Sequence, residues 1–123
     1  MYLRGIGEKE GRYDEAIRRI KAYAAAGADG AFVPGLTDLA TIGRIAKESP
    51  LPLNVMLSPG LAPAPQLEGL GVARLSIGGS AAFAAMSLTR KIAQELLTQG
   101  TYDVFTQHPP VPHLEVMKMF PAK

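Results

Sequence analysis

The sequence contains no cysteine, and this absence excludes several classes of protein. A disulfide-stapled secreted domain, a thiolate metal site and a cysteine nucleophile all need that residue. Tryptophan is also missing, and the longest weakly polar run, SAAFAAMSL, is far shorter than the ~20 residues that span a bilayer. The amino-terminal stretch MYLRGIGEKEGRYDE lacks the apolar region of a signal peptide. These absences predict a soluble cytoplasmic protein with no membrane partner.

An excess of charge of one sign is missing as well. The 13 lysines and arginines are nearly balanced by 11 aspartates and glutamates, which leaves a formal net charge of +2. Because nucleic-acid binders concentrate basic residues on one face, we expect no nucleic-acid partner. Apolar residues make up 47% of the chain and charged residues 20%, a balance typical of globular proteins. The 123 residues fit one domain but are about half of the ~250 that a complete eight-stranded α/β barrel needs.

Helix and strand patterns alternate along the chain. A first helix is expected from about Asp14 to Gly27, and a second begins after Thr37, a plausible N-cap, and ends before Pro50. Strands are predicted at 31–33, 51–57 and 72–77, one helical turn at 66–70, and a long helix at 81–98 with Ser80 as its N-cap. This order predicts an α/β fold of parallel strands joined by right-handed crossover helices.

No linker or break in composition divides the chain. We therefore expect a single unit over residues 1–123. It would consist of a loop at 1–11, βα units at 12–105, and a proline-rich tail at 106–123 with a short helix around Leu114 to Phe120.

The two faces of the later strands differ in polarity. Alternation puts the aliphatic residues on one face and the polar or small residues on the other. The aliphatic set is Leu53, Val55 and Leu57 with Ala73, Leu75 and Ile77, and the opposite set is Asn54 and Met56 with Arg74, Ser76 and Gly78. A doubly wound sheet is apolar on both faces, whereas the inner face of a barrel lines the active site near the strand carboxyl ends. The pattern therefore favours part of a (β/α)8 barrel of the TIM type, with about three parallel βα units.

The long helix opens with residues that are apolar all the way round, from Ala81 to Met86. A helix without a polar face is buried on every side. Because a chain of this size has too little protein to bury it, this segment predicts a partner surface, and we expect a homo-oligomer formed through it.

Few other residues are candidates for catalysis or ligand binding. Gly78-Gly79-Ser80 opens a helix and could hold an anion, but a tight strand-to-helix turn is the simpler interpretation. We expect His108 and His113 to be surface residues and Arg74 to be salt-bridged or snorkelled inside the wall. Asp29 precedes a strand and Asp38 lies at the start of a helix, so neither is placed for catalysis. No paired carboxylates, catalytic triad or metal-spaced cluster stands out.

Three stretches, taken in order, resemble one known family. YAAAGADGAFVPGLTDL, LPLNVML and GVARLSIGGSAAFAAM are similar to the carboxy-terminal half of the isocitrate lyase/phosphoenolpyruvate mutase superfamily. The match is to members of the phosphonomutase-like or oxaloacetate-decarboxylase-like kind, and it runs from Asp14 to about Asp103.

The resemblance implies a (β/α)8 barrel that uses Mg²⁺. Such enzymes cleave or rearrange a C–C or P–C bond next to a carboxylate, through an enolate of a small α-keto acid, while the metal polarises the oxygens. In the family, the metal-binding acidic residues, the mobile catalytic loop and a substrate-binding arginine lie on earlier strands, and Tyr2-Leu3-Arg4 looks like the stretch just past the last of these. We therefore expect no catalytic residue and no metal ligand in this sequence.

What the resemblance does imply here is a wall of the substrate pocket. It places Asn54 near the end of the seventh strand, where its amide would bind a substrate carboxylate, and it places Ser76, Gly78 and Gly35 along the same wall. A structural asparagine, satisfied by neighbouring backbone, is the alternative for Asn54. Pro34 occupies a position where many lyase members have glutamate, which argues against a methylisocitrate-lyase-type reaction.

Two hypotheses follow. The chain is either the carboxy-terminal portion of a Mg²⁺-dependent lyase or mutase, inactive alone, or a non-catalytic α/β module that associates with itself. The first explains the polar strand face, and the second explains the apolar helix.

Overall fold

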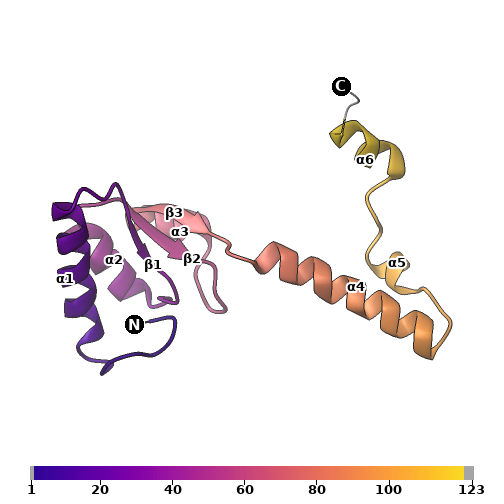
Figure 1. The fold of residues 1–123 in the computed structure, drawn as a ribbon, viewed down its shortest axis with the longest axis horizontal. Helices are drawn as coiled ribbons and strands as arrows, with labels where there is room; N and C mark the ends of the chain where they lie inside the picture. The colour runs from indigo at the N-terminus through magenta and orange to yellow at the C-terminus, as the bar shows by residue number, and fades with distance from the viewer. Residues whose placement is uncertain (1, 121–123) are drawn as a thin grey trace. The chain divides into compact units, whose positions relative to one another are not determined.

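The structure, a computed structural model, describes residues 2–120. The chain divides into two compact units, Met1–Ser80 and Ala81–Lys123. Figure 1 traces the first unit in indigo to pink and the second in orange to yellow. The expectation of a single domain over residues 1–123 stays a prediction.

The first unit contains the predicted alternation of helices and strands (Figure 1). The order αβαβαβ is confirmed, and the predicted strands at 51–57 and 72–77 are each shorter than expected. The elements are α1 (Arg12–Ala25), β1 (Ala31–Val33), α2 (Leu39–Glu48), β2 (Leu53–Met56), α3 (Ala64–Gly69) and β3 (Val72–Ser76).

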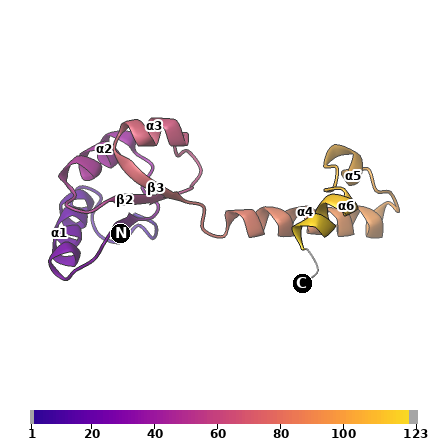
Figure 2. The same cartoon turned by 90° about the horizontal axis from the view of Figure 1, so that it is seen from above.

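The three strands form one parallel sheet in the order β1-β2-β3. Figure 2 shows α2 and α3 on the same side of the strands. The core lies between this face of the sheet and the helices, and its fully buried side chains are Ile42, Ile45, Leu53, Val55 and Leu67. Burying each such side chain stabilises the fold by about 1.5–3 kcal/mol, so this layer fixes the strands that carry the opposite face.

A register shift between Leu53 and Asn54 decides which residues of β3 face the core. Leu53 pairs with Val72, but Asn54 pairs with Arg74, so Ala73 is the extra residue of a bulge. Val72 and Leu75 therefore pack on the core, while Arg74 and Ser76 join the face of Asn54. The prediction that Ala73 shares the aliphatic face with Leu75 is wrong, because strict alternation of side chains assumes a strand without a bulge.

The N-cap of α2 is Asp38, and the prediction of Thr37 is wrong by one residue. The Asp38 carboxylate accepts a hydrogen bond from the Thr41 backbone amide at 2.8 Å. Because the helix begins at Leu39, Thr41 is its third residue and its free amide points at the capping position. Hydrogen bonding by Thr41 lowers the pKa of Asp38 below its ordinary value.

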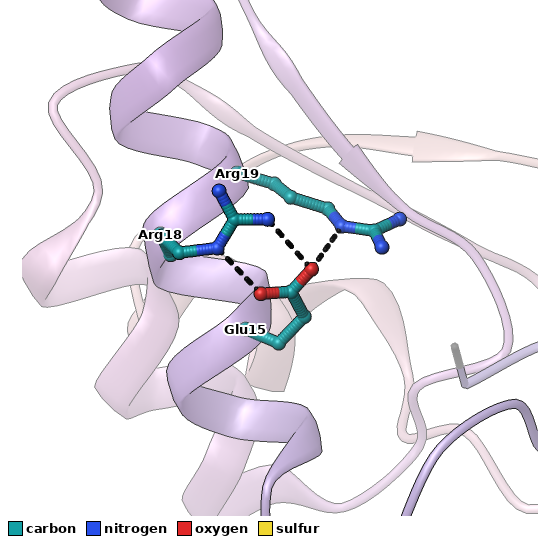
Figure 3. Close-up of polar contacts among 3 residues, drawn as sticks. All are labelled: Glu15, Arg18 and Arg19. Atoms are coloured by element: carbon teal, nitrogen blue, oxygen red, sulfur yellow. Dashed lines mark hydrogen bonds and ion pairs between the residues drawn. The ribbon is translucent and has the colours of Figure 1, made fainter.

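The exposed side of α1 carries an ionic cluster, drawn in Figure 3. The Glu15 carboxylate accepts hydrogen bonds from Arg18 Nε at 2.6 Å and from Arg19 Nε at 2.7 Å. These bonds lower the pKa of Glu15 to about 2. Since all three side chains are exposed or half-exposed, solvent screening keeps the contribution of the cluster to stability small. The cluster supports the helix and has no geometry of a binding site.

Three helices follow β3, namely α4 (Ser80–Thr98), α5 (Val104–Gln107) and α6 (His113–Met119), and the second unit contains them from Ala81 onward. Ser80, the predicted N-cap, is the first helical residue of α4, so this helix begins one residue earlier than predicted. The short tail helix begins at His113, also one residue before its predicted start. No residue of α4 is buried in the described chain, and Phe83 is 67% exposed. Within residues 2–120, no helix has the length and apolar character needed to cross a membrane.

Candidate functional site

Two polar side chains meet on the open face of the sheet. Asn54 lies in β2 and Ser76 in β3, and both are half-buried. Asn54 Nδ2 donates to Ser76 Oγ at 2.9 Å, and Ser76 Oγ donates to Asn54 Oδ1 at 3.1 Å. Ser76 is the last residue of β3, at the carboxyl end where parallel barrels build their sites, and Asn54 is the second residue of the parallel strand β2. The structure thus brings together two of the four predicted wall residues.

The backbone around this pair is held in register. Met56 pairs with Ser76, and the Leu57 amide donates to the Ser76 carbonyl at 2.7 Å. On the other side of β2, Phe32 pairs with Asn54 and is 52% exposed. The pair therefore lies on paired strands, beside an exposed apolar side chain.

Arg74 lies directly opposite Asn54 in the pairing of β2 with β3. Its side chain is exposed, and the expected ion pair of Arg74 is not found among residues 2–120. Asn54, Arg74 and Phe32 help to line a hollow of about 330 Å³ on this face, together with Asp29, Gly30 and Pro52, which precede the strands. The face thus offers the Arg74 guanidinium and the Asn54 amide as donors, with the Asp29 carboxylate in the same hollow.

Gly35 follows β1, and a packing contact explains why the residue is glycine. Its backbone has φ +80°, and a Cβ built there would overlap Leu3 Cα and lie 2.6 Å from Leu3 N. The amino-terminal segment therefore passes directly against this turn. The structure gives Gly35 a structural role, and its place in the pocket wall stays a prediction.

Gly78 follows β3 with φ +55°. A Cβ there would meet Met56 Sδ at 3.5 Å, an ordinary contact, so the left-handed backbone is what favours glycine. The Ser80 amide donates to the Ile77 carbonyl at 3.1 Å, which closes the predicted tight turn between strand and helix. A role of Gly78 in substrate binding stays a prediction.

Other residues considered in the sequence lie apart from this face. His108 and His113 are exposed, as predicted, and belong to the second unit. The carboxylates whose pKa is lowered, Glu15, Asp38 and Glu95, lie on or cap helices. Within the described residues, no three histidines, aspartates or glutamates come close enough to hold a metal ion.

Two features of the structure are absent from the prediction. The alternation of residues places Asn54 and Ser76 on one face but does not predict that they form hydrogen bonds with each other. The prediction also gives Glu95 no role, although this carboxylate accepts hydrogen bonds from Thr101 Oγ1 at 2.7 Å and from the Val104 amide at 3.0 Å. A signal for the first pair was available, since both side chains fall on the polar face of strands that follow each other in the chain.

Comparison with protein families gives one match, which spans most of the chain. Residues 1–97 match the family described as phosphoenolpyruvate phosphomutase. These residues include all three strands and the Asn54–Ser76 pair.

Individual proteins are similar over the same region. The chain is 39% identical over 84 residues to an oxaloacetate decarboxylase of Ectopseudomonas mendocina (strain ymp), covering 67% of this chain and 29% of that protein. A candidate lyase/mutase from Burkholderia cenocepacia J2315 matches with a TM-score of 0.83 at 35% identity, covering 98% of this chain and 42% of the other. An oxaloacetate acetylhydrolase structure with oxalate shares the fold, with a TM-score of 0.71 at 18% identity.

The chain thus spans less than half the length of these relatives. Its three parallel strands and their helices correspond to part of a (β/α)8 barrel. The predicted fold class, an α/β partial barrel, is confirmed.

Proposed function

Because this chain belongs to the phosphoenolpyruvate phosphomutase family, we propose that it is the carboxy-terminal portion of a lyase or phosphonomutase-type enzyme. The substrate would be a small α-keto or carboxylic acid, similar to oxaloacetate or phosphonopyruvate, and the reaction would pass through an enolate. The portion present here would supply a wall of the substrate pocket and would be inactive alone.

The observation that carries this proposal is the polar sheet face with Asn54 on it. An asparagine amide has two N–H donors, and a carboxylate accepts such bonds well. Asn54 lies within the region matched by the family, in a strand whose other face is anchored in the core by Leu53 and Val55. A donor on a rigid strand can hold the substrate carboxylate while the bond next to it reacts. Ser76, Gly78 and Gly35 complete the proposed wall.

The choice of reaction within the family rests on Pro34. This residue follows β1, at a position where many lyase members have glutamate. Proline has no side-chain group that transfers a proton, so chemistry that needs a carboxylic acid at this point is disfavoured. We therefore favour an oxaloacetate-decarboxylase-like or phosphonomutase-like reaction over a methylisocitrate-lyase-like one.

The Mg²⁺ of the parent family would be bound by residues that this chain does not supply. We expect isothermal titration of the full chain with MgCl₂ to give no specific binding, with CaCl₂ as the control for non-specific heat. Micromolar binding of Mg²⁺ would show that the chain has ligands of its own and would contradict this part of the proposal.

A segment exchange tests the proposed activity. The matching 84-residue segment of the Ectopseudomonas decarboxylase is replaced by the corresponding residues of this chain, and pyruvate release from oxaloacetate is measured. We expect a folded chimera to release pyruvate above a blank with metal and buffer alone, and the 123-residue chain to give only the blank rate. A folded chimera at the blank rate would contradict the proposal.

A second candidate function is self-association, which the exposed helix favours. Phe83 and Met86 in α4 are 67% and 63% exposed. We propose that the segment Ala81 to Met86 packs against a second copy of the chain in a homo-oligomer. Sedimentation velocity should show that Phe83→Lys dissociates the oligomer, while Leu97→Lys, at an 86% exposed position of the same helix, leaves it unchanged. Equal behaviour of the two variants would remove this segment as the interface.

A further inference from the structure

We propose that Ser76 is a positioning residue, whose hydroxyl fixes the plane of the Asn54 amide so that one N–H stays free for a ligand carboxylate. The identity of the ligand rests on the proposed function, whereas the locking of the amide does not. Ser76 then acts through Asn54 and need not touch the ligand.

The two hydrogen bonds of the pair form a closed ring. The Ser76 hydroxyl has one proton to donate and can accept as well. It donates to Asn54 Oδ1 at 3.1 Å while accepting from Asn54 Nδ2 at 2.9 Å. One hydroxyl therefore contacts both ends of the amide from a single side, and tilting the amide plane would lengthen at least one of the two distances.

Counting donors and acceptors shows what remains for a ligand. The amide has two N–H groups and an oxygen with two lone pairs. The ring uses one N–H and one lone pair, so the second N–H is left on the side away from Ser76. A small carboxylate is the ligand class that this N–H suits, with the exposed guanidinium of Arg74 on the neighbouring strand adding a positive charge.

The bulge in β3 is what makes the ring possible. With the pairing of Leu53 and Val72 continued regularly, Ser76 would share the buried face of Val55. The shift at Ala73 moves Ser76 to the face of Asn54 instead. Bulges often redirect a side chain next to a site, and this one supplies the hydroxyl that Asn54 needs.

Fixing the amide matters because its last torsion is soft. The final side-chain torsion of asparagine has broad, roughly two-fold preferences, so an unpaired Asn54 amide would sample several planes. A ligand would then have to order it on binding. We expect loss of the Ser76 hydroxyl to weaken carboxylate binding about threefold to tenfold, the usual effect of ordering one side chain.

The test is an NMR measurement on the full chain, with the Asn54 side-chain amide assigned by its loss in Asn54→Ser. In the wild type, the Asn54 amide protons should show a nuclear Overhauser effect to the Ser76 Hβ protons, and the amide order parameter should be near that of rigid backbone, about 0.85. Ser76→Ala should lower that order parameter below about 0.6, and Ser76→Thr, which keeps a hydroxyl, should restore it. Ser58→Ala is the matched control, because its hydroxyl donates to the Met56 carbonyl at 3.3 Å and not to Asn54.

Two results would overturn the positioning role of Ser76. One is an Asn54 amide order parameter in Ser76→Ala that equals the wild-type value. The other is the absence of the Overhauser effect in the wild type, a result that does not depend on any variant folding. A titration with oxalate then separates the two proposals. If the amide is ordered by Ser76 but oxalate shifts no Asn54 resonance, the positioning stands and the carboxylate contact of the proposed function fails.

Discussion

Gly35 and Gly60 have nearly the same left-handed backbone, with φ +80° and +83°, but different neighbours. Nothing lies within 4 Å of a Cβ built at Gly60, whereas one at Gly35 would meet the Leu3 backbone. Gly60→Ala should therefore lower the free energy of unfolding by about 1–2 kcal/mol through backbone strain alone. Gly35→Ala should lower it by about 1–3 kcal/mol more, because the Leu3 backbone must move. Urea unfolding of both variants measures the difference.

The comparison of Gly35→Ala with Gly60→Ala can also contradict the contact between Gly35 and Leu3. If the two variants are equally stable, the amino-terminal segment does not pass against the turn at Gly35 in solution. Gly35 would then be available as the open pocket-wall residue that the family resemblance implies.

Residue patterns predicted some of this detail and missed the rest for physical reasons. Alternation along β2 places Asn54 on the face opposite to Leu53 and Val55, and the burial of these residues in the structure agrees. In β3, the bulge at Ala73 depends on how two strands pair, which no single strand encodes. The N-cap of α2 was missed because Thr37 and Asp38 are both good capping residues, and only the start of the helix at Leu39 selects between them.

At the scale of elements, Glu95 joins α4 to the turn before α5. Its carboxylate accepts hydrogen bonds from the Thr101 hydroxyl and from the backbone amides of Asp103 and Val104. The hydrogen bond from Thr101 is the main cause that lowers the pKa of Glu95 below its ordinary value of 4.5. A long helix and a short one are thus connected by a single ionised side chain.

Glu95→Gln should release the turn before α5, because a neutral amide is a weaker acceptor for these donors. Faster hydrogen exchange at the Val104 amide, by tenfold or more, is the expected result at neutral pH. Glu115→Gln, at an exposed position of α6, is the control and should leave Val104 unchanged. Unaltered exchange in Glu95→Gln would mean that other contacts hold the turn.

The same group sets a pH dependence with a definite sign. Because the pKa of Glu95 is lower in the folded chain than in the unfolded one, its stabilising effect is present above pH 4.5 and is lost as the pH falls through the folded pKa. Amide chemical shifts of Asp103 and Val104 should therefore move together below pH 4.5. A shift centred above pH 4.5 would contradict a lowered pKa.

Long, strongly patterned elements were the most predictable. The first helix was expected from its spacing of apolar residues and the long fourth helix from Ser80 as its N-cap, and the short α5 was not expected, because four residues carry too little periodicity to detect. Its position depends on Glu95, eight or nine residues earlier in the chain.

At the scale of the whole molecule, the sheet ends in open edges. Within the described residues, β1 pairs only with β2, and β3 pairs only with β2. A hollow of about 200 Å³ lined by residues of α1 and β1, including Ile20 and Phe32, lies beside the free edge of β1. Unpaired strands of this kind invite association with another chain.

We therefore expect the isolated 123-residue chain to self-associate, either as dimers or as larger aggregates. Light scattering over a range of protein concentrations measures this directly. A chain that stays monodisperse and monomeric at every concentration would contradict both the open sheet edges and the proposed interface at Ala81 to Met86.

If this chain supplies the substrate-binding wall of a larger enzyme through Asn54, Asn54→Ala in the decarboxylase chimera should weaken the reaction with oxaloacetate. Since a hydrogen bond to a charged group contributes about 1.5–3 kcal/mol, kcat/KM for oxaloacetate should fall about tenfold to a hundredfold, with the fold of the variant checked by circular dichroism. Ser58→Ala in the same chimera should leave kcat/KM within about twofold of the parent. An Asn54→Ala chimera that is folded and as active as its parent would show that Asn54 does not bind the substrate.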